Sequence, residues 1–146
     1  MSMTYKILGQ QYVGLTSTTT PGGTTIVPGD YYYGSGGGSI IVNDPTITES
    51  LEPVTLYTVP AGKYTIVSSV FATNHDVVER TYDLAIVPSG ETLAAKHHIR
   101  WDYPVSANDF DVISMKLTLA AGDKIIVLPS TADKIGFTAF GVEVNI

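Results

Sequence analysis

From Leu51 to its end, the chain alternates short apolar runs with tight-turn sequences, and no long stretch has a helical period. The runs are rich in β-branched and aromatic residues, which favour strands. Tyr82, Leu84 and Ile86 occupy alternate positions and so share one face of a strand, which Pro88 and Gly90 end. The predicted strands fall within 54–60, 63–72, 81–90, 93–103, 111–120, 124–129 and 135–146. Seven or more short strands predict an all-β fold, an antiparallel β-sandwich or jelly roll.

Two details of this pattern allow more than one interpretation. Residues 58–69 and 118–129 align without gaps and share an Ala-Gly turn. We interpret them as two hairpins with similar turns and not as a duplication, because a solenoid-type repeat needs three or more copies. Residues 89–98 contain a weak helix start, and we assign them as strand or loop.

The first fifty residues have a different composition. Residues 5–10 are suited to a strand that pairs at a sheet edge, whereas 15–39 are rich in Thr, Gly and Pro and have few aliphatic residues. Such a segment cannot build its own core. The chain therefore divides into 1–50, a strand followed by an extended arm or insertion, and 51–146, the sandwich domain.

Three consecutive tyrosines stand beside a glycine run at 34–38. A mobile surface loop is the simpler interpretation, but long loops in compact domains are commonly functional. Glycine lets the backbone approach another surface closely, and tyrosine adds a large contact area with a hydroxyl. We therefore predict an arm that docks on another chain. Its interface residues are Tyr31, Tyr32, Tyr33, Ile40 and Ile41.

Composition limits the classes of function. With 146 residues the chain can bury one substantial core, and its 15% charged residues are few enough to favour a component of an assembly. The net charge of −6 and the lack of a basic run argue against nucleic-acid binding. No apolar stretch is long enough for a membrane span, and the first ten residues do not resemble a signal peptide. The chain has no cysteine, so disulfides, thiolate nucleophiles and the common zinc frameworks are excluded.

The residues that could carry catalysis or bind metal do not form a recognisable motif. His97 and His98 are adjacent, so on a strand they point to opposite faces, and His75 lies in a turn sequence. Asp109 and Asp111 could share a face, as calcium ligands or a glycosidase pair would, but turn formation explains this region equally well. We predict no catalytic, cofactor or metal site and no enzymatic activity.

The stretch 98–104 contains the only tryptophan. Alternation predicts Trp101 and Tyr103 on one face of the strand and Arg100 with Asp102 on the other. The pair is either an aromatic platform for sugar or protein, or a core tryptophan flanked by a surface ion pair. We favour the core interpretation and keep Trp101 and Tyr103 as a possible platform.

Several of these segments resemble the small β-sandwich structural proteins of tailed bacteriophages. The similar segments are YKILGQ (5–10), LYTVPAG (56–62), TYDLAIVPSGE (81–91), WDYPVSANDF (101–110), LAAGDKIIV (119–127) and FTAFGVEV (137–144). They are mostly turn and core residues, so the resemblance implies a fold and membership of a virion, with no active site. The chain departs from the family pattern at 11–50, where it carries an insertion. Because of this insertion, the resemblance does not say whether the protein belongs to the capsid, neck, tail or fibre.

The resemblance implies a non-enzymatic virion structural protein, assembled in the host cytoplasm. The leading expectation is a capsid decoration (cement) protein that binds and stabilises the assembled shell. Its expected partners are further copies of itself, as a trimer, and the major capsid protein or other virion proteins. The alternative is a receptor- or glycan-binding module associated with the tail, neck or fibre.

Overall fold

The structure, a computed structural model, describes residues 3–12, 17–19, 25–26 and 48–146. Two compact units make up the chain: Met1–Val13 with Pro53–Ile146, and Gly14–Glu52. The predicted interface residues lie outside the described residues: Tyr31, Tyr32, Tyr33, Ile40 and Ile41.

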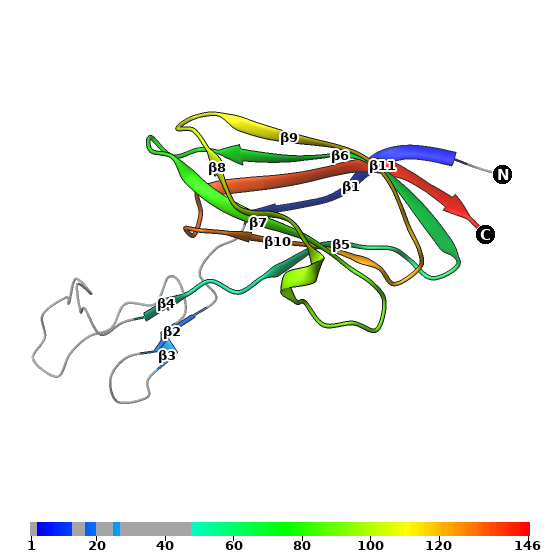
Figure 1. Cartoon of the computed structure of the whole chain (residues 1–146), viewed down its shortest axis with the longest axis horizontal. Coiled ribbons are helices and arrows are strands. Elements are labelled where there is room, and N and C mark those ends of the chain that lie inside the picture. Colours follow the sequence, from blue (N-terminus) through cyan, green and yellow to red (C-terminus); the bar gives the residue numbers. More distant parts are fainter. Residues whose placement is uncertain (1–2, 13–16, 20–24, 27–47) are drawn as a thin grey trace, which may run out of the picture. The chain divides into compact units, whose positions relative to one another are not determined.

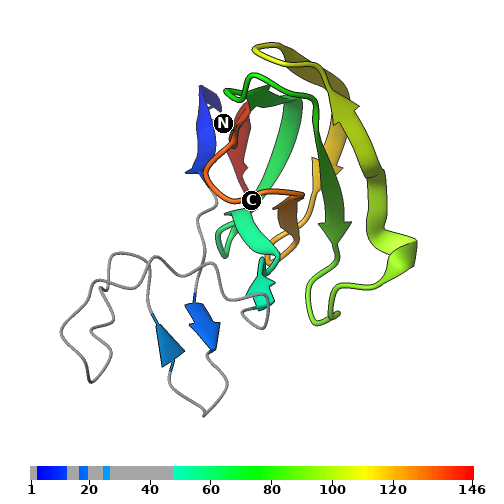
Figure 2. The ribbon, with the colours of Figure 1, turned by 90° about the vertical axis from the view of Figure 1, so that its left-hand side faces the viewer.

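The first unit contains two four-stranded sheets in which all neighbouring strands are antiparallel (Figure 1). Its elements are β1 (Met3–Tyr12), β5 (Val54–Thr58), β6 (Lys63–Asn74), β7 (Arg80–Val87), η1 (Ala95–His97), β8 (His98–Val105), β9 (Phe110–Leu119), β10 (Lys124–Pro129) and β11 (Ile135–Asn145). One sheet has the order β1-β11-β6-β9, and the other has the order β5-β10-β7-β8. Figure 2 shows β1, β11 and β6 side by side in blue, red and green.

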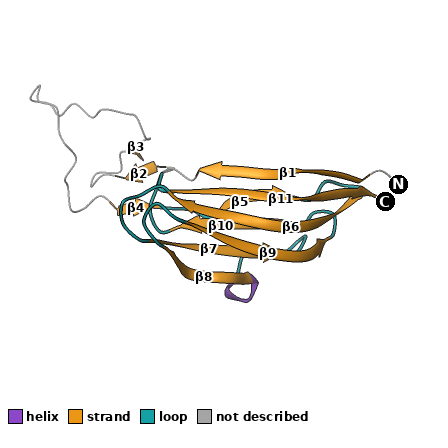
Figure 3. Cartoon of the chain, turned by 90° about the horizontal axis from the view of Figure 1, so that it is seen from above, coloured by secondary structure: helices purple, strands orange, loops and turns teal. Residues whose placement is uncertain are grey.

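The strand order is that of a jelly roll. The first strand of this unit pairs with the last (β1 with β11), the second with the next to last (β5 with β10), and so on inward to β6 with β9 and β7 with β8. Each successive pair lies in the opposite sheet, as a long hairpin does when it is rolled up. In Figure 3 the molecule is seen from above, so the strands of the two sheets overlap. The predicted antiparallel sandwich or jelly roll is therefore confirmed, with β1 at a sheet edge as expected.

The core lies between the two sheets. Alternate residues of β11, namely Ile135, Phe137 and Ala139, are almost completely buried, and their neighbours Thr138 and Phe140 are not. The other sheet contributes buried side chains at alternate positions of its two central strands: Tyr82 and Leu84 from β7, and Ile125 and Val127 from β10. Pairing of Ile86 with Ile125 and of Leu84 with Val127 confirms the predicted shared face of β7.

The two Ala-Gly turns join different sheets, so the interpretation as hairpins is wrong. One turn leads from β5 to β6 and the other from β9 to β10, and in each case the two strands belong to opposite sheets. Gly62 (φ +71°) and Gly122 (φ +87°) supply the left-handed backbone that both corners need. Val59 N–H donates to the Asp123 carbonyl and Gly122 N–H to the Val59 carbonyl, both at 2.9 Å, so the corners support each other.

The stretch assigned as strand or loop includes the short 3₁₀ helix η1, and β8 begins at His98. His97 stabilises this turn, because its Nδ1 accepts the Ala94 N–H at 3.0 Å while its Nε2 lies 3.0 Å from a carboxylate oxygen of Glu91. Hydrogen bonds from Lys96 and His97 lower the pKa of Glu91.

The second unit contains a small sheet with the order β3-β2-β4. Its strands are β2 (Ser17–Thr19), β3 (Thr25–Ile26) and β4 (Thr48–Ser50). Because β2 pairs with β4, the chain that enters this unit runs antiparallel to the chain that leaves it.

Candidate functional site

Strand β8 is interrupted by a β-bulge at the predicted aromatic platform. Tyr103 is paired with Tyr82 and Arg100 with Leu84, so Trp101 and Asp102 are both opposite Asp83. A bulge of this kind shifts the alternation of side chains by one residue. Arg100 and Tyr103 therefore share a face, and the guanidinium lies 4.3 Å from the centre of the Tyr103 ring. The predicted alternation of Trp101 and Tyr103 against Arg100 and Asp102 is wrong for this reason.

Trp101 is 59% exposed, so the core interpretation is also wrong. Its ring contacts the ring of His98, with centroids 4.3 Å apart and planes at 62°. His98 pairs with Ala85, which lies on the opposite face of β7 from the inward-facing Leu84. The ring contact therefore places Trp101 at the outer face of the β5-β10-β7-β8 sheet. The predicted ion pair of Arg100 with Asp102 is not formed, and Arg100 faces Asp111.

The inner side of the bulge is an aromatic and ionic cluster that joins the two sheets. The Tyr82 hydroxyl donates to Asp111 on β9 at 2.6 Å, and Nε of Arg100 lies 3.5 Å from the same carboxylate oxygen. Tyr103 packs edge-on against Tyr82, with ring centroids 6.0 Å apart. Burial raises the pKa of Tyr82, and the bond to Asp111 raises it further. We assign this cluster to the stability of the fold.

The carboxylates and histidines singled out in the sequence make separate contacts. Asp109 accepts the backbone N–H of Phe110 in its turn, whereas Asp111 accepts Tyr82. His97 is buried in η1, and His98 contacts Trp101. Within the described part of the chain, no three or more histidine and carboxylate side chains gather in a group that could hold a metal ion.

A second candidate surface, which the sequence analysis did not predict, is the outer face of the β1-β11-β6-β9 sheet. Directly opposite residues of neighbouring strands share a face, so the register gives the rows of this surface. The rows are Ile7-Phe140-Ser69-Ser114, Gln10-Thr138-Phe71-Val112, Gly136-Thr73-Phe110 and Val142-Ile66-Thr118. The charged Lys116 of β9, exposed between Ser114 and Thr118, lies beside these rows, but none of the fourteen residues in them is charged. We call these residues the uncharged face.

The uncharged face carries three of the four phenylalanines of the chain. Phe71 lies between Phe140 and Phe110, with ring centroids 5.6 Å and 6.3 Å away. Phe110 is 58% exposed and Ile7 is 51% exposed. Aromatic side chains gathered on an exposed sheet face are typical of a protein interaction surface.

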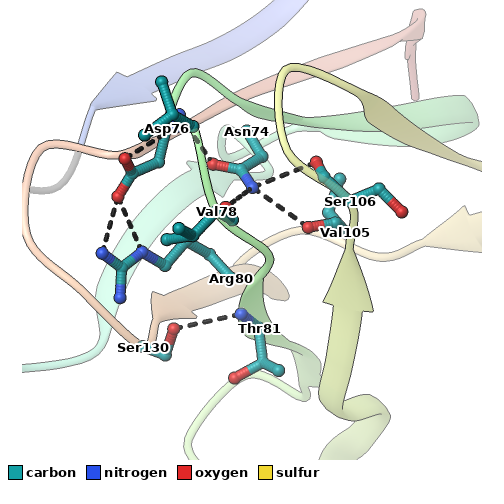
Figure 4. Close-up of polar contacts among 9 residues, drawn as sticks. Asn74, Asp76, Val78, Arg80, Thr81, Val105, Ser106 and Ser130 are labelled. Atoms are coloured by element: carbon teal, nitrogen blue, oxygen red, sulfur yellow. Dashed lines mark hydrogen bonds and ion pairs between the residues drawn. The ribbon is translucent and has the colours of Figure 1, made fainter.

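At one end of the sandwich, Asn74 and Asp76 fix three loops to one another (Figure 4). Nδ2 of Asn74 lies within 2.9–3.1 Å of the carbonyl oxygens of Val78, Val105 and Ser106, and its Oδ1 accepts the Asp76 N–H. Arg80 pairs with Asp76 at 2.6 Å, and hydrogen bonding from Arg80 lowers the pKa of that carboxyl. The backbone bonds from Asn108 to Asp76 and from His75 to Lys134 connect the other two loops. These bonds therefore connect the three loops at this end of the sandwich.

The inner face of β11 carries a buried carboxylate, Glu143, which is only 6% exposed. It accepts Lys6 at 2.8 Å, Lys63 at 2.7 Å and the Tyr57 hydroxyl at 2.9 Å. Burial alone would raise the pKa of Glu143, but the bonds from Lys6, Lys63 and Tyr57 outweigh it and lower the pKa to about 2. Burial also raises the pKa of Tyr57 to about 12, and the neighbouring Glu143 adds to this shift. The cluster ties the edge strand β1 to β11 and β6.

The described residues include no helix of the length and apolarity needed to cross a membrane. In comparisons with protein-family models, with curated proteins and with solved structures, no match to this chain was found.

Proposed function

We propose that this chain is a non-enzymatic structural protein of a bacteriophage virion, a capsid decoration (cement) protein that binds and stabilises the assembled shell. The observation that carries the proposal is the uncharged face, because an aromatic surface of this kind is suited to burial against a neighbouring protein. The jelly-roll order and the resemblance of the turn and core segments to phage sandwich proteins support the same function.

The occupant that best fits the uncharged face is a second copy of this chain. Each copy carries eight basic and fourteen acidic residues, a net charge of −6, so two copies repel over most of their surfaces. The uncharged face lets two copies meet without placing like charges opposite each other. We assign the contacts within the proposed homo-oligomer, a trimer by the resemblance, to this face.

The size of the face agrees with a role inside a larger assembly. Four strands about 4.8 Å apart, each with about eight residues at about 3.4 Å, make a surface of about 500 Å². One partner in a stable interface buries about 800 Å². A contact of this size is weak alone and becomes strong when many copies are held on one particle. Contact with the shell itself is proposed for Tyr31, Tyr32, Tyr33, Ile40 and Ile41.

The test of the function uses particles with and without this protein. Purified chain should co-sediment with empty shells, and decorated shells should break at a higher temperature or denaturant concentration than bare shells. Equal resistance of the two kinds of particle would contradict the cement function. It would favour the alternative, a receptor- or glycan-binding module of the tail, neck or fibre.

Variants separate the two proposed contacts. Phe110→Ser should weaken self-association by about tenfold or more, measured by light scattering over a concentration series. Ile99→Ser changes an exposed apolar residue of the other sheet and serves as the matched control. Serine at Tyr31, Tyr32 and Tyr33 should weaken shell binding by about tenfold and leave the melting temperature of the free protein unchanged. A lowered melting temperature with intact shell binding would place these tyrosines in the protein's own core.

A further inference from the structure

The bulge in β8 holds a strained residue. Three non-glycine residues among those described have positive φ, and Asp102 (φ +46°) alone of the three lies within a strand. Asn108 and Asp133 lie in turns, where such a conformation is common. The Asp102 N–H donates to Oδ1 of Asp83 at 2.7 Å, and this bond fixes the bulge. Strain that is held by a specific bond at a bulge often marks a functional site.

The consequence of the bulge is that Trp101 lies exposed beside His98 and Asp83. The Nε2 of His98 lies 3.9 Å from Oδ2 of Asp83, which is too far for a hydrogen bond. Among the described residues, neither atom has a donor within hydrogen-bond distance. Both side chains are mostly buried, at 12% and 18% exposed, so their positions are fixed.

The hydrogen-bonding roles of these two atoms follow from their neighbours. Nδ1 of His98 lies 3.3 Å from the Ala94 carbonyl, which only accepts, so Nδ1 carries the ring proton. Nε2 is then an acceptor in the neutral imidazole and a donor in the imidazolium, and Oδ2 of Asp83 is an acceptor in both cases. The surface therefore presents a carboxylate oxygen and a ring nitrogen side by side, next to an exposed indole.

Two hydroxyl groups on neighbouring carbons match this arrangement, because one can donate to Asp83 while the other donates to His98 or accepts from it. A pyranose carries such a vicinal diol together with an apolar C–H face that can lie on an indole ring. An ammonium group also suits acceptors beside an aromatic ring. Two polar atoms 3.9 Å apart, one of which can accept or donate, fit the diol better, because an ammonium group can only donate.

We propose that Trp101, His98 and Asp83 form a carbohydrate-binding site that holds a pyranose by a vicinal diol and stacks it on the indole. The site is independent of the proposed cement function, since it lies on the other sheet from the uncharged face. Tyr103, the second residue of the platform predicted from the sequence, is not part of it, because its ring is engaged by Arg100.

The experiment uses the single tryptophan as the probe. Trp101 is the only tryptophan of the chain, so tryptophan emission, excited at a wavelength that the nine tyrosines do not absorb, reports on this site alone. Titration with the methyl glycosides of mannose, galactose and glucose should change the emission, with half-saturation at about 1–10 mM for at least one of them. The same sugar methylated on both diol oxygens should bind at least about tenfold more weakly, since it cannot donate.

Two variants complete the test. Asp83→Asn should weaken sugar binding by at least about tenfold, because the amide presents a donor where the diol needs an acceptor, while its oxygen can still accept the Asp102 N–H. Phe110→Ser, which removes an equally exposed aromatic ring on the other sheet, should leave sugar binding unchanged. Circular dichroism checks that both variants are folded.

Three results would overturn the proposal. The first is no change in emission up to about 100 mM of each sugar. The second is equal binding of the methylated and the free sugar by the wild-type chain. The third is that millimolar tetramethylammonium displaces the sugar and that this cation alone binds as strongly as the sugar does. The first two need no variant, so an unfolded variant does not weaken the test.

Discussion

Replacing Glu143 by glutamine tests how the sandwich holds its edge strand. The substitution keeps the size of the side chain and an oxygen that can accept the Tyr57 hydroxyl. It removes the charge that Lys6 and Lys63 face at 2.8 Å and 2.7 Å. We expect the free energy of unfolding to fall, because two ammonium groups lose their anionic partner at the joint between β1, β11 and β6.

The size of the loss follows from the pKa. Glu143 is lowered from its ordinary value of 4.5 to about 2 in the folded chain. One unit of pKa difference corresponds to about 1.4 kcal/mol, so the charged form stabilises the fold by about 3 kcal/mol. Both lysines are partly exposed, at 44% and 34%, and regain some hydration in the variant, which reduces the expected loss to about 2–3 kcal/mol at pH 7.

The loss depends on pH in a defined direction. Because the folded pKa lies below the unfolded one, the contribution of Glu143 is complete above about pH 4.5 and disappears as the pH falls toward 2. Urea denaturation followed by circular dichroism at pH 7, 4.5, 3 and 2 measures it. The free energy of unfolding of the wild-type chain should exceed that of the Gln variant at pH 7, and the difference should shrink as the pH falls to 2. Glu79→Gln, an exposed change, is the control and should stay within about 0.5 kcal/mol at every pH. A difference between wild type and the Gln variant that is the same at pH 7 and pH 2 would refute the reasoning.

Three further predictions concern the fold. Gly9→Ala places a Cβ against the Leu56 carbonyl oxygen, so it should lower the free energy of unfolding by about 1–3 kcal/mol, and an unchanged urea midpoint would contradict this contact. Asn74→Ala removes the amide that binds three loop carbonyls, so the backbone amides of His75 and Asn108 should exchange hydrogen faster. Unchanged protection of these amides would show that the backbone hydrogen bonds alone hold the loops together. Replacing Gly14–Glu52 by a short Gly-Ser linker should leave β-type circular dichroism and a cooperative melt, and a disordered spectrum would mean that this unit is required for folding.

The strands of the sandwich could be predicted from the sequence because period-two alternation is a local signal. Strand β10 occupies the predicted residues 124–129, and β9 and β11 differ from prediction by one residue at their ends. The assignment of strands to sheets could not be predicted in this way. The Ala-Gly sequences at Gly62 and Gly122 specify a left-handed turn, but the same turn serves a hairpin and a corner between sheets.

Part of the uncharged face could have been predicted from the sequence. Phe137 and Phe140 are three residues apart, so on a regular strand they cannot share a face, and once Phe137 is inside Phe140 must be outside. The same parity places Glu143 on the inner face with Phe137, six residues away. The partners that make this burial possible, Lys6 and Lys63, are distant in the chain, and no local pattern indicates them.

The site at Trp101 could not be predicted, because it depends on a bond across two strands. Alternation would hold for Trp101 and Tyr103 if β8 were regular. The bulge exists because Asp83, nineteen residues before Asp102, accepts its N–H and fixes the left-handed backbone there. Asp83 is an ordinary polar residue in the sequence of β7, and only its pairing with β8 shows that it can act in this way.

The two outer faces of the sandwich differ in chemistry, and this difference separates the proposed functions. The uncharged face of the β1-β11-β6-β9 sheet has aromatic, aliphatic and hydroxyl side chains, with the charged Lys116 beside them, and suits burial against another copy. The outer face at β7 and β8 has a carboxylate, an imidazole and an exposed indole, which suit a small polar ligand. The side chains that pack between the two sheets face inward and belong to neither site. Assembly through one face would therefore leave the other open to solvent, so a particle built from this chain would carry one carbohydrate site for each bound copy. Weak binding at each site would then be strengthened by the number of copies.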